Sequence, residues 1–452
     1  MFSPQHILHQ EQGSALATVL VISVIIMLFI GAIFSGIILQ GRFIQRGVDN
    51  TKAWYAAEEG VFRYLNLEAE TPTYTSKALV SLSSGNTASI TAIPFGGFWD
   101  IQSQVFISNQ TKKVRMLIGD ESIGLTDAAI ALGDSTSSLT VTGTTNVFGK
   151  VYSTNQTIRE EDFKGVPFRG VMDAPTSSLK EEGGMPEFNT GLFELQEEYF
   201  ESLFTNTRLR GFDSSFTGIN PQVITQDTLF LEGDIVWESN QEISLKRELM
   251  VIVKGNLTIN GPYTFAPYSK FIVEDTLLVG GVTKGTHLLF YAGTSLQIGG
   301  STRSAAQVLS KGEVTIRDQA YLLYPSMVYS SKEFSNAGKA EVIDIRDQSV
   351  VDGMLLYPYQ PNPFNREQLQ VRIGQQATVR GGLYTRGQTE LLGTVYGSVF
   401  TDQFYFYESP TSYINWLKDV TIDVTERPDD FVLPIGFSDT TRYSILDWNV
   451  VE

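Results

Sequence analysis

The N-terminal part of the chain contains an uninterrupted apolar stretch. No charged residue occurs over the 30 positions from Gln12 to Gly41, and the segment from Ala15 to Leu39 is apolar apart from scattered Ser, Thr and Gly. At ~1.5 Å per residue this segment forms a helix of roughly 37 Å, longer than the ~30 Å hydrocarbon core of a bilayer. A buried helix of a soluble protein would show a polar face, which this segment lacks. The pattern predicts one membrane-spanning helix.

The helical pattern continues beyond the apolar stretch. Apolar residues then recur at separations built from steps of three and four, with charged residues mostly between them. The recurring apolar positions are Ile44, Val48, Tyr55, Phe62 and Leu65. A continuous helix over residues 14–67 would be roughly 80 Å long, apolar all round in its first half and amphipathic in its second.

A cleaved secretory signal is the nearest alternative for this segment. Such a signal begins with basic residues and has an apolar stretch of about 7 to 15 residues. No Lys or Arg precedes Arg42, and the apolar run is longer than that. The pattern therefore favours a retained helix.

Alternating apolar and polar positions predict that the rest of the chain is mainly β. Residues 71–125 contain short alternating runs separated by Gly, Asn and Ser, which indicate a small antiparallel meander within a β region over residues 68–127. Residues 156–222 are polar and hold one helical pattern, LFELQEEYFESLF, so they are interpreted as an insertion.

Residues 227–330 carry the clearest repeat. Each unit is an apolar alternating strand, a short polar turn and another alternating strand. The turn positions Gly233, Gly255, Asp275, Gly293 and Gly312 are 22, 20, 18 and 19 residues apart. About 20 residues is the size of a β-solenoid coil, which buries its inward side chains only by stacking on its neighbours. Leucine-rich repeats have that length too, but their leucine and asparagine ladder is missing.

These repeats predict a right-handed parallel β-helix over residues 128–402, interrupted by the insertion at 156–222. Its inward side chains are expected to include Ile252, Leu257 and Ile259, with Lys254 pointing outward. Residues 403–452 are aromatic and strand-like, and are interpreted as a cap that covers the end of the solenoid. The expected fold is thus a long N-terminal helix, a small meander and a β-solenoid.

Composition removes several classes of function. Fifty acidic against 33 basic residues give a formal charge of −17, which disfavours nucleic acid as a partner. The chain has no cysteine and three histidines, His6, His9 and His287, so thiolate catalysis, disulfides and Cys/His zinc sites are excluded. Neither a phosphate-binding glycine motif nor a calcium loop is present. No metal and no cofactor is expected.

Parallel β-helices also occur in polysaccharide lyases and hydrolases, so paired carboxylates are candidates for catalysis. Glu274 and Asp275 replace a turn glycine of the repeat and are expected at a solvated corner. Asp344 and Asp347 are expected on the surface. The one histidine of the body, His287, begins an apolar strand and is expected to be a strand-end residue, not a base. These patterns do not predict an enzyme.

At its N-terminus the sequence resembles the type IV filament pilins, and among them the PilX-like minor pilins. The matching segments are the polar leader MFSPQHILHQEQG, the apolar SALATVLVISVIIMLF directly after it, and AWYAAEEGVFRYL about 40 residues further on. In that family a prepilin peptidase cuts after the glycine, which is Gly13 here. The resemblance implies a leader of residues 1–13 and a mature chain that begins at Ser14.

The resemblance covers about 55 residues and also assigns a helix motif. Its members are small residues and one acid, namely Ala53, Ala56, Ala57, Glu58 and Gly60. The sequence departs from the family at the fifth mature position, where most pilins carry glutamate and this chain has Thr18. A similar absence is known in the large minor pseudopilin at the tip of type II secretion filaments, so the resemblance implies a place at or near a filament tip.

The resemblance implies a non-catalytic subunit held in the inner membrane by one helix and then displayed in an extracytoplasmic filament. Its partners would be other pilin or pseudopilin subunits and the prepilin peptidase, with an unidentified surface or glycan as a further ligand. The basic residues Arg42, Arg46 and Lys52 follow the apolar helix, and the positive-inside rule alone would place the body in the cytoplasm. A membrane-tethered scaffold resembling bactofilins, and a surface-anchored polysaccharide enzyme, remain as alternatives.

Overall fold

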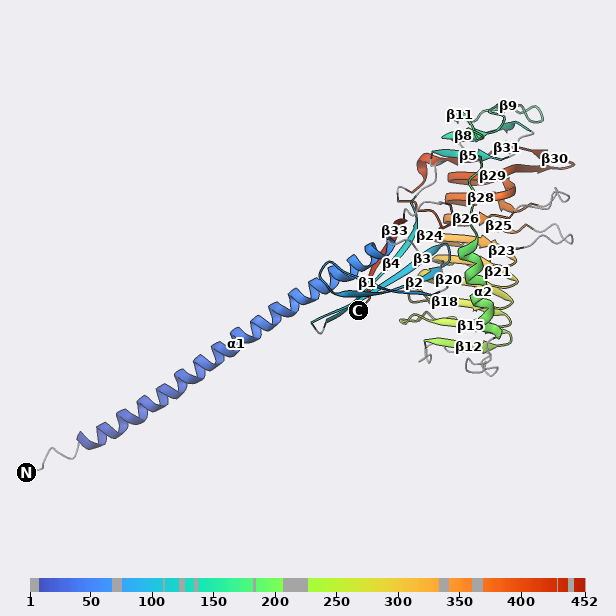
Figure 1. Ribbon diagram of the computed structural model, residues 1–452. Coiled ribbons are helices and arrows are strands. Elements are labelled where there is room, and N and C mark those ends of the chain that lie inside the picture. The colour runs from blue at the N-terminus through green and yellow to red at the C-terminus, as the bar shows by residue number, and fades with distance from the viewer. Residues whose placement is uncertain are drawn as a thin grey trace, which may run out of the picture.

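The structure is a computed structural model of the 452-residue chain. It describes eleven segments, which are residues 8–66, 75–108, 110–121, 127–133, 137–181, 184–205, 227–332, 341–359, 369–428, 430–437 and 443–451. Figure 1 shows a long helix that leads into a small sheet, which in turn lies against a large β-solenoid. The predicted fold class, a long apolar helix followed by a mainly β body with stacked parallel strands, is confirmed.

Helix α1 (Leu8–Leu65) is 58 residues long. Its apolar first part projects away from the rest of the protein (Figure 1). Its last turns lie on a five-stranded antiparallel sheet, here called the stalk sheet, with the order β1-β2-β3-β4-β33. The strands of the stalk sheet are β1 (Ser76–Ser81), β2 (Thr87–Phe95), β3 (Phe98–Ile107), β4 (Gln110–Asp120) and β33 (Tyr443–Val451). The predicted meander thus forms, and the end of the chain adds a fifth strand to it.

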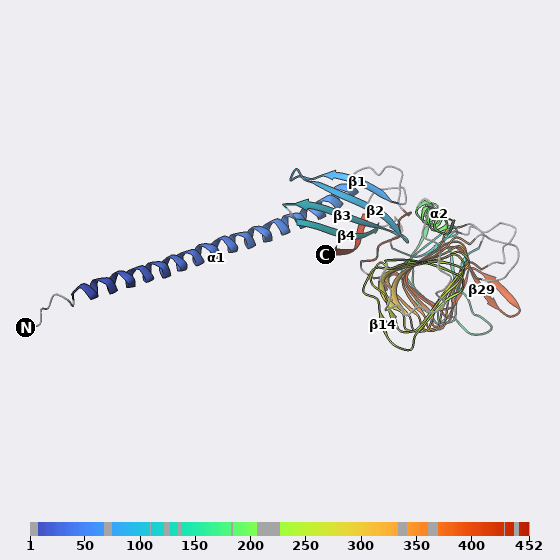
Figure 2. The same cartoon turned by 90° about the horizontal axis from the view of Figure 1, so that it is seen from below.

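The solenoid is built from three parallel ladders, one on each face of its coils. The first ladder consists of β12 (Thr228–Glu232), β15 (Met250–Lys254), β18 (Lys270–Val273), β20 (Lys284–Ala292), β22 (Arg303–Ser310), β24 (Tyr321–Ser330), β26 (Val350–Tyr357), β28 (Thr378–Leu391), β29 (Thr394–Glu408), β5 (Ala128–Leu132), β8 (Lys150–Ser153) and β11 (Thr176–Ser178). Viewed along the stack in Figure 2, the superposed coils form a tube with α2 against one side.

The second and third ladders use shorter strands. The second contains β13 (Ile235–Glu238), β16 (Leu257–Asn260), β19 (Thr276–Gly280), β21 (Ser295–Ile298), β23 (Glu313–Ile316), β25 (Ile343–Ile345) and β27 (Val371–Ile373). A separate parallel sheet lies at the far end of the stack and consists of β31 (Trp416–Lys418), β6 (Leu139–Thr142) and β9 (Ile158–Glu160). The third contains β14 (Ile243–Ser244), β17 (Tyr263–Thr264), the first residues of the long strands β20, β22, β24, β26, β28 and β29, then β32 (Thr421–Asp423), β7 (Asn146–Phe148) and β10 (Met172–Asp173).

The turn glycines of the repeat lie between the first and second ladders, and Gly255 stacks on Gly233 of the neighbouring coil. A Cβ added to Gly255 would lie 2.6 Å from the carbonyl oxygen of Gly233 on the neighbouring coil. Gly255 also has a φ of +127°, which side chains other than glycine rarely adopt. Close coil stacking and turn geometry therefore both require glycine at this position.

The coils do not stack in the order of the sequence. The coil that begins with β5 stacks on β29, with Ile130 opposite Val399, and therefore lies at the end reached last by residues 227–402. The chain then passes through β8 and β11, and α2 (Gly191–Thr205) lies along the first ladder (Figure 1). Residues 156–222 are consequently not an insertion throughout, since β9, β10 and β11 continue the stack. Without the β5 coil, the ladder would end at β29 with an exposed edge. Stacking of β5 on β29 supplies the backbone partners that this edge lacks.

The solenoid has one core inside its coils and another outside them. Leu257 and Ile259 belong to the inner core, as predicted, together with Val251 and Val253. Ile252 is 1% exposed but belongs to the outer core, between the first ladder, α2 and the stalk sheet. Its predicted inward orientation is therefore wrong. The strand is buried on both faces, so its continuous apolar run carries no alternation from which orientation can be read.

The predicted C-terminal cap is also wrong. Strands β31 and β32 join the stack, and β30 (Thr411–Ile414) forms a hairpin with the end of β29 that projects from the solenoid wall (Figures 1 and 2). After the short helix η3 (Val424–Glu426) the chain returns to the stalk sheet, where β33 pairs with β4. This segment thus completes the small sheet and does not cap the end of the stack.

Candidate anchoring helix and its junction with the solenoid

The first part of α1 presents apolar side chains in every direction. Met27 is 76% exposed, Leu28 69% and Phe29 66%, and the most apolar 18 residues of the helix have no cover from any described part of the chain. The glycines of this part, Gly31 and Gly36, have no neighbouring atom within 4 Å of an added Cβ. By length and composition this is the one described helix that is able to cross a membrane. An uncovered apolar surface of this extent marks a site of contact with a membrane or with another protein.

The residues assigned to processing lie near the start of α1. Gly13 and Ser14 are helical, and Thr18 lies about one turn further on and is exposed. The predicted cleavage after Gly13 and the role of Thr18 stay predictions.

The small residues of the helix motif face the stalk sheet. Ala53 and Ala57 are fully buried and Ala56 is 5% exposed, so the helix backbone comes close to the sheet. At Gly60 an added Cβ would lie 2.6 Å from the Cβ of Ala88 and 2.7 Å from the Oγ of Ser103. Any larger residue at Gly60 would push the helix away from β2 and β3. Glu58, the acidic member of the motif, is half-buried.

Polar contacts fix the helix to the turn after β1. The backbone N–H and the hydroxyl of Ser83 donate to the carboxylate of Glu59 at 2.7 and 2.9 Å. Arg63 pairs with Glu59 at 2.7 Å and donates to the carbonyl oxygen of Ser81 at 3.0 Å. The backbone hydrogen bond from Ser83 is the main reason that the pKa of Glu59 is lowered. Sequence reasoning did not identify Glu59 or Arg63 as contacts of the sheet, because Ser81 and Ser83 lie beyond the helix and carry no local signal of this pairing.

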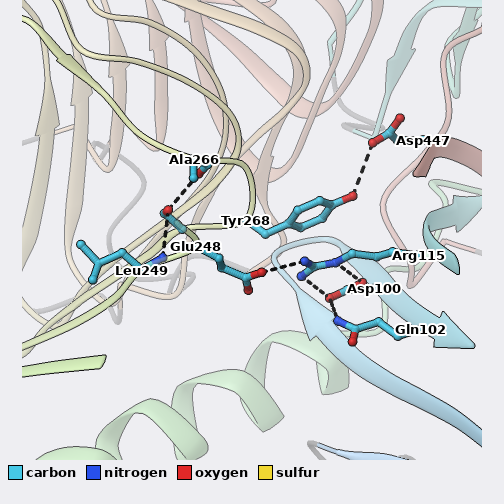
Figure 3. A network of polar contacts seen from close by, with 9 residues as sticks. Asp100, Gln102, Arg115, Glu248, Leu249, Ala266, Tyr268 and Asp447 are labelled. Atoms are coloured by element: carbon cyan, nitrogen blue, oxygen red, sulfur yellow. Dashed lines mark hydrogen bonds and ion pairs between the residues drawn. The ribbon is translucent and has the colours of Figure 1, made fainter. Parts of the chain in front are cut away.

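A buried polar network joins the stalk sheet to the solenoid (Figure 3). Arg115 on β4 donates to both carboxylate oxygens of Asp100 on β3, at 2.8 and 2.6 Å, and to Glu248 of the solenoid at 2.9 Å. Its guanidinium carbon lies 3.3 Å from the ring centroid of Tyr268, also from the solenoid. Burial alone would lower the pKa of Arg115, but hydrogen bonds and charge from Asp100 and Glu248 outweigh it and raise the pKa. The arginine therefore stays charged and holds two parts of the chain together.

His287 lies in the same network and is not a simple strand-end residue. It occupies a bulge of β20 with a φ of +50°, its ring stacks on Tyr268 at a centroid distance of 5.0 Å, and its Nε2 lies 2.8 Å from the Oδ2 of Asp447 on β33. Burial lowers the pKa of His287, while Asp447 acts in the opposite direction. The geometry supports a structural contact between the solenoid and the last strand.

A second contact between the two parts is made by the turn between β2 and β3. The backbone N–H of Gly96 donates to the side-chain oxygen of Gln196 on α2 at 2.9 Å, and Gln196 donates back to the carbonyl oxygen of Gly96 at 2.8 Å. The N–H of Gly97 donates to Gln307 of the solenoid at 3.2 Å. Gln196 and Gln307 are fully buried. The turn is thus held between α2 and the first ladder.

The carboxylates considered for catalysis lie in different surroundings. Glu274 and Asp275 occupy the turn between β18 and β19, as expected. Asp344 is 2% exposed, contrary to the expected surface position, and lies 2.8 Å from Arg346. Asp347 lies in the turn after β25 with a φ of +55°. Burial raises the pKa of Asp344, with Arg346 opposing this effect. Among the described residues no group of three or more potential ligands is arranged to hold a metal ion.

No protein-family model and no curated protein matches this chain. Among solved structures, the chain is similar to the competence-associated pilin ComZ from Thermus thermophilus, with 10% sequence identity over 89% of this chain and 98% of that chain. The TM-score of this match is 0.23. A value this low does not indicate a shared fold, and we draw no functional conclusion from it.

Proposed function

We propose that this chain is a minor pilin-like subunit, anchored by α1 in the inner membrane and then built into a type IV pilus or a related secretion filament. The observation that carries the proposal is the division of α1 into two parts. Its first part offers an uncovered apolar surface, and its last turns are packed on an antiparallel sheet through Ala53, Ala57 and Gly60. A helix with these two surfaces both anchors a folded body and packs against equivalent helices of other subunits.

The body acts in this proposal as a displayed structural head without catalytic activity. Its polar contacts join parts of the chain to one another, as Arg115 does, and the acids Asp344 and Asp347 occupy different environments. The head lies across the end of α1 in Figure 1, with coils on both sides of the junction. A wide head in this position is difficult to repeat at every step of a thin filament, which supports sparse placement at or near a tip.

Thr18 supports the same placement. A hydroxyl has no charge with which to neutralise the buried terminal amine of a neighbouring subunit. A subunit at the tip has no such neighbour ahead of it. The absence of glutamate at this position is therefore compatible with the first place in the filament and unfavourable elsewhere.

The alternative of a cytoplasmic membrane-tethered scaffold is favoured by one observation. Arg42, Arg46 and Lys52 are all exposed and follow the apolar part of α1, on the side of the membrane where the body lies. The two functions predict opposite topologies. Because the chain has no cysteine, a single Lys254→Cys variant reports the side of the body through labelling with a membrane-impermeant maleimide in spheroplasts.

N-terminal sequencing of the membrane-extracted protein, from cells with and without prepilin peptidase, tests the proposed function. A start at Ser14 that depends on the peptidase is the expected result. Gly13→Leu should leave the 13-residue leader attached, visible as a heavier species by mass spectrometry. The matched variant Gly31→Leu, at an open position of the same helix, should be processed normally. Normal cleavage of the Gly13→Leu chain, or a start at Ser14 without the peptidase, would contradict the assignment.

A further inference from the structure

The last strand of the chain contacts all three parts of the molecule. Strand β33 is the edge strand of the stalk sheet and pairs with β4 from Tyr443 opposite Asp120 to Val451 opposite Lys113. Within the described segments it has a strand partner on one side alone, so its other edge is open. An edge strand of this kind separates from its sheet at a lower free energy than a central strand does.

On one side β33 contacts the helix. The ring of Trp448 lies 5.4 Å from that of Trp54 on α1, and Tyr443 packs against the core between α1 and the stalk sheet. Trp448 is 40% exposed, so its ring lies over the surface of this contact and not in the core. Aromatic pairs of this geometry contribute beyond the area that they bury.

On the other side β33 contacts the solenoid. The carboxylate of Asp447 lies 2.8 Å from His287 and accepts a hydrogen bond from Tyr268 at 3.4 Å, which is drawn in Figure 3. Leu446 packs against the outer core that the solenoid shares with α2. Adjacent residues of one strand therefore connect the helix and the solenoid directly.

We propose that β33 is a clasp, which fixes the orientation of the solenoid relative to α1 and whose release allows the solenoid to turn. With β33 released, the stalk sheet keeps its contacts through Arg115 to Glu248 and through the turn at Gly96 and Gly97. These contacts, together with the outer core that Phe98 and Leu117 of the stalk sheet share with the solenoid, leave the solenoid attached. The clasp thus links the orientation of the 58-residue helix α1 to that of the solenoid. This link does not depend on which side of the membrane the solenoid occupies.

The clasp is tested by distance measurement between two spin labels in the full chain, in detergent micelles. The absence of native cysteine allows labels at Tyr55→Cys on α1 and Lys254→Cys on the solenoid, both at exposed positions. The parent should give one narrow distance distribution. Asp447→Asn combined with Trp448→Ala should widen it at least twofold, while Ile445→Ala, at a 41% exposed position of the same strand, should leave it narrow. Equal widths in the two variants would overturn the proposal.

Amide hydrogen exchange of the unlabelled parent provides a second measurement that needs no variant. The β33 amides that pair with β4 should exchange together and at least tenfold faster than those of β2 and β3, because release of the clasp frees the amides shared by β33 and β4 and leaves the rest of the meander folded. If these amides exchange no faster than those of β2 and β3, the strand does not open on its own and the clasp is refuted. Neither measurement depends on peptidase processing, so failure of the clasp and failure of the proposed function are distinguishable.

Discussion

The guanidinium of Arg115 lies over the ring of Tyr268, with its central carbon 3.3 Å from the ring centroid. One residue belongs to the stalk sheet and the other to the solenoid, so this contact is part of the junction between them. Asp100 behind the arginine is 1% exposed and is held by two hydrogen bonds from it. The arginine that contacts the solenoid is thus also the partner of a buried carboxylate within the stalk sheet.

Replacement of Arg115 should destabilise the chain. Arg115→Ala leaves the buried carboxylate of Asp100 without its partner, and removal of one member of such a pair costs about 3 to 5 kcal/mol. Glu248→Gln is the matched change at the exposed end of the network, where the side chain is 51% exposed, and should cost less than about 1 kcal/mol. Urea unfolding followed by circular dichroism measures both. Equal losses would mean that the pair with Asp100 is not the main contact.

The contact between α1 and the stalk sheet should be sensitive to a single methyl group. Gly60→Ala places a Cβ 2.6 Å from Ala88, and overpacking of this kind costs about 1 to 3 kcal/mol, more than the gain in helix propensity. Gly47→Ala adds the same group where nothing lies within 4 Å and should be neutral or slightly stabilising. Thermal unfolding of the two variants side by side tests this. A Gly60→Ala chain as stable as Gly47→Ala would disprove the close packing.

The interface between α2 and the solenoid should weaken as the pH rises. Burial raises the pKa of Glu197 from 4.5 to about 7, although Ser331 donates a hydrogen bond to it at 2.6 Å. Because the folded-state pKa lies above the unfolded value, the contribution to stability is complete below pH 4.5 and is lost as the pH rises through about 7.

Glu197→Gln should therefore be more stable than the parent at pH 8 and nearly equal to it at pH 4.5. The gain at pH 8 has an upper bound of roughly 3 kcal/mol. Glu198→Gln, at an exposed acid of the same helix, serves as the matched control. The measurement is the unfolding free energy of each chain between pH 4.5 and pH 8. The same pH dependence of this free energy in the parent and in Glu197→Gln would contradict the prediction.

The inner core of the solenoid should tolerate truncation poorly. Leu257→Ala removes a fully buried side chain between stacked coils, and such changes typically cost ~2 to 5 kcal/mol. Lys254→Ala, at an exposed position three residues earlier, should change stability by less than about 0.5 kcal/mol. Denaturant midpoints compare the two. Similar losses at both positions would mean that the register of this coil is wrong.

The sequence by itself determined the elements whose signals are local. A bilayer core requires about 20 apolar residues in succession, and the stretch from Ala15 to Leu39 satisfies this without reference to any other part of the chain. The spacing of Gly233, Gly255 and the later turn positions likewise revealed the coils, since an alternating strand, a short polar turn and a second alternating strand recur about every 20 residues. Leu257 and Ile259 were placed inside correctly because their strand alternates.

The tertiary structure alone decided which elements meet. Parallel ladders form through backbone groups that every residue possesses, so nothing in the sequence indicated that β5 stacks on β29 or that β33 pairs with β4. The orientation of Ile252 was hidden because its strand is apolar on both faces. Arg115, Glu248 and Asp447 form one junction through distances of a few ångströms between distant parts of the chain. The sequence around a charged residue does not indicate which residue it will pair with. Here the packing of the stalk sheet on the solenoid determines the partner.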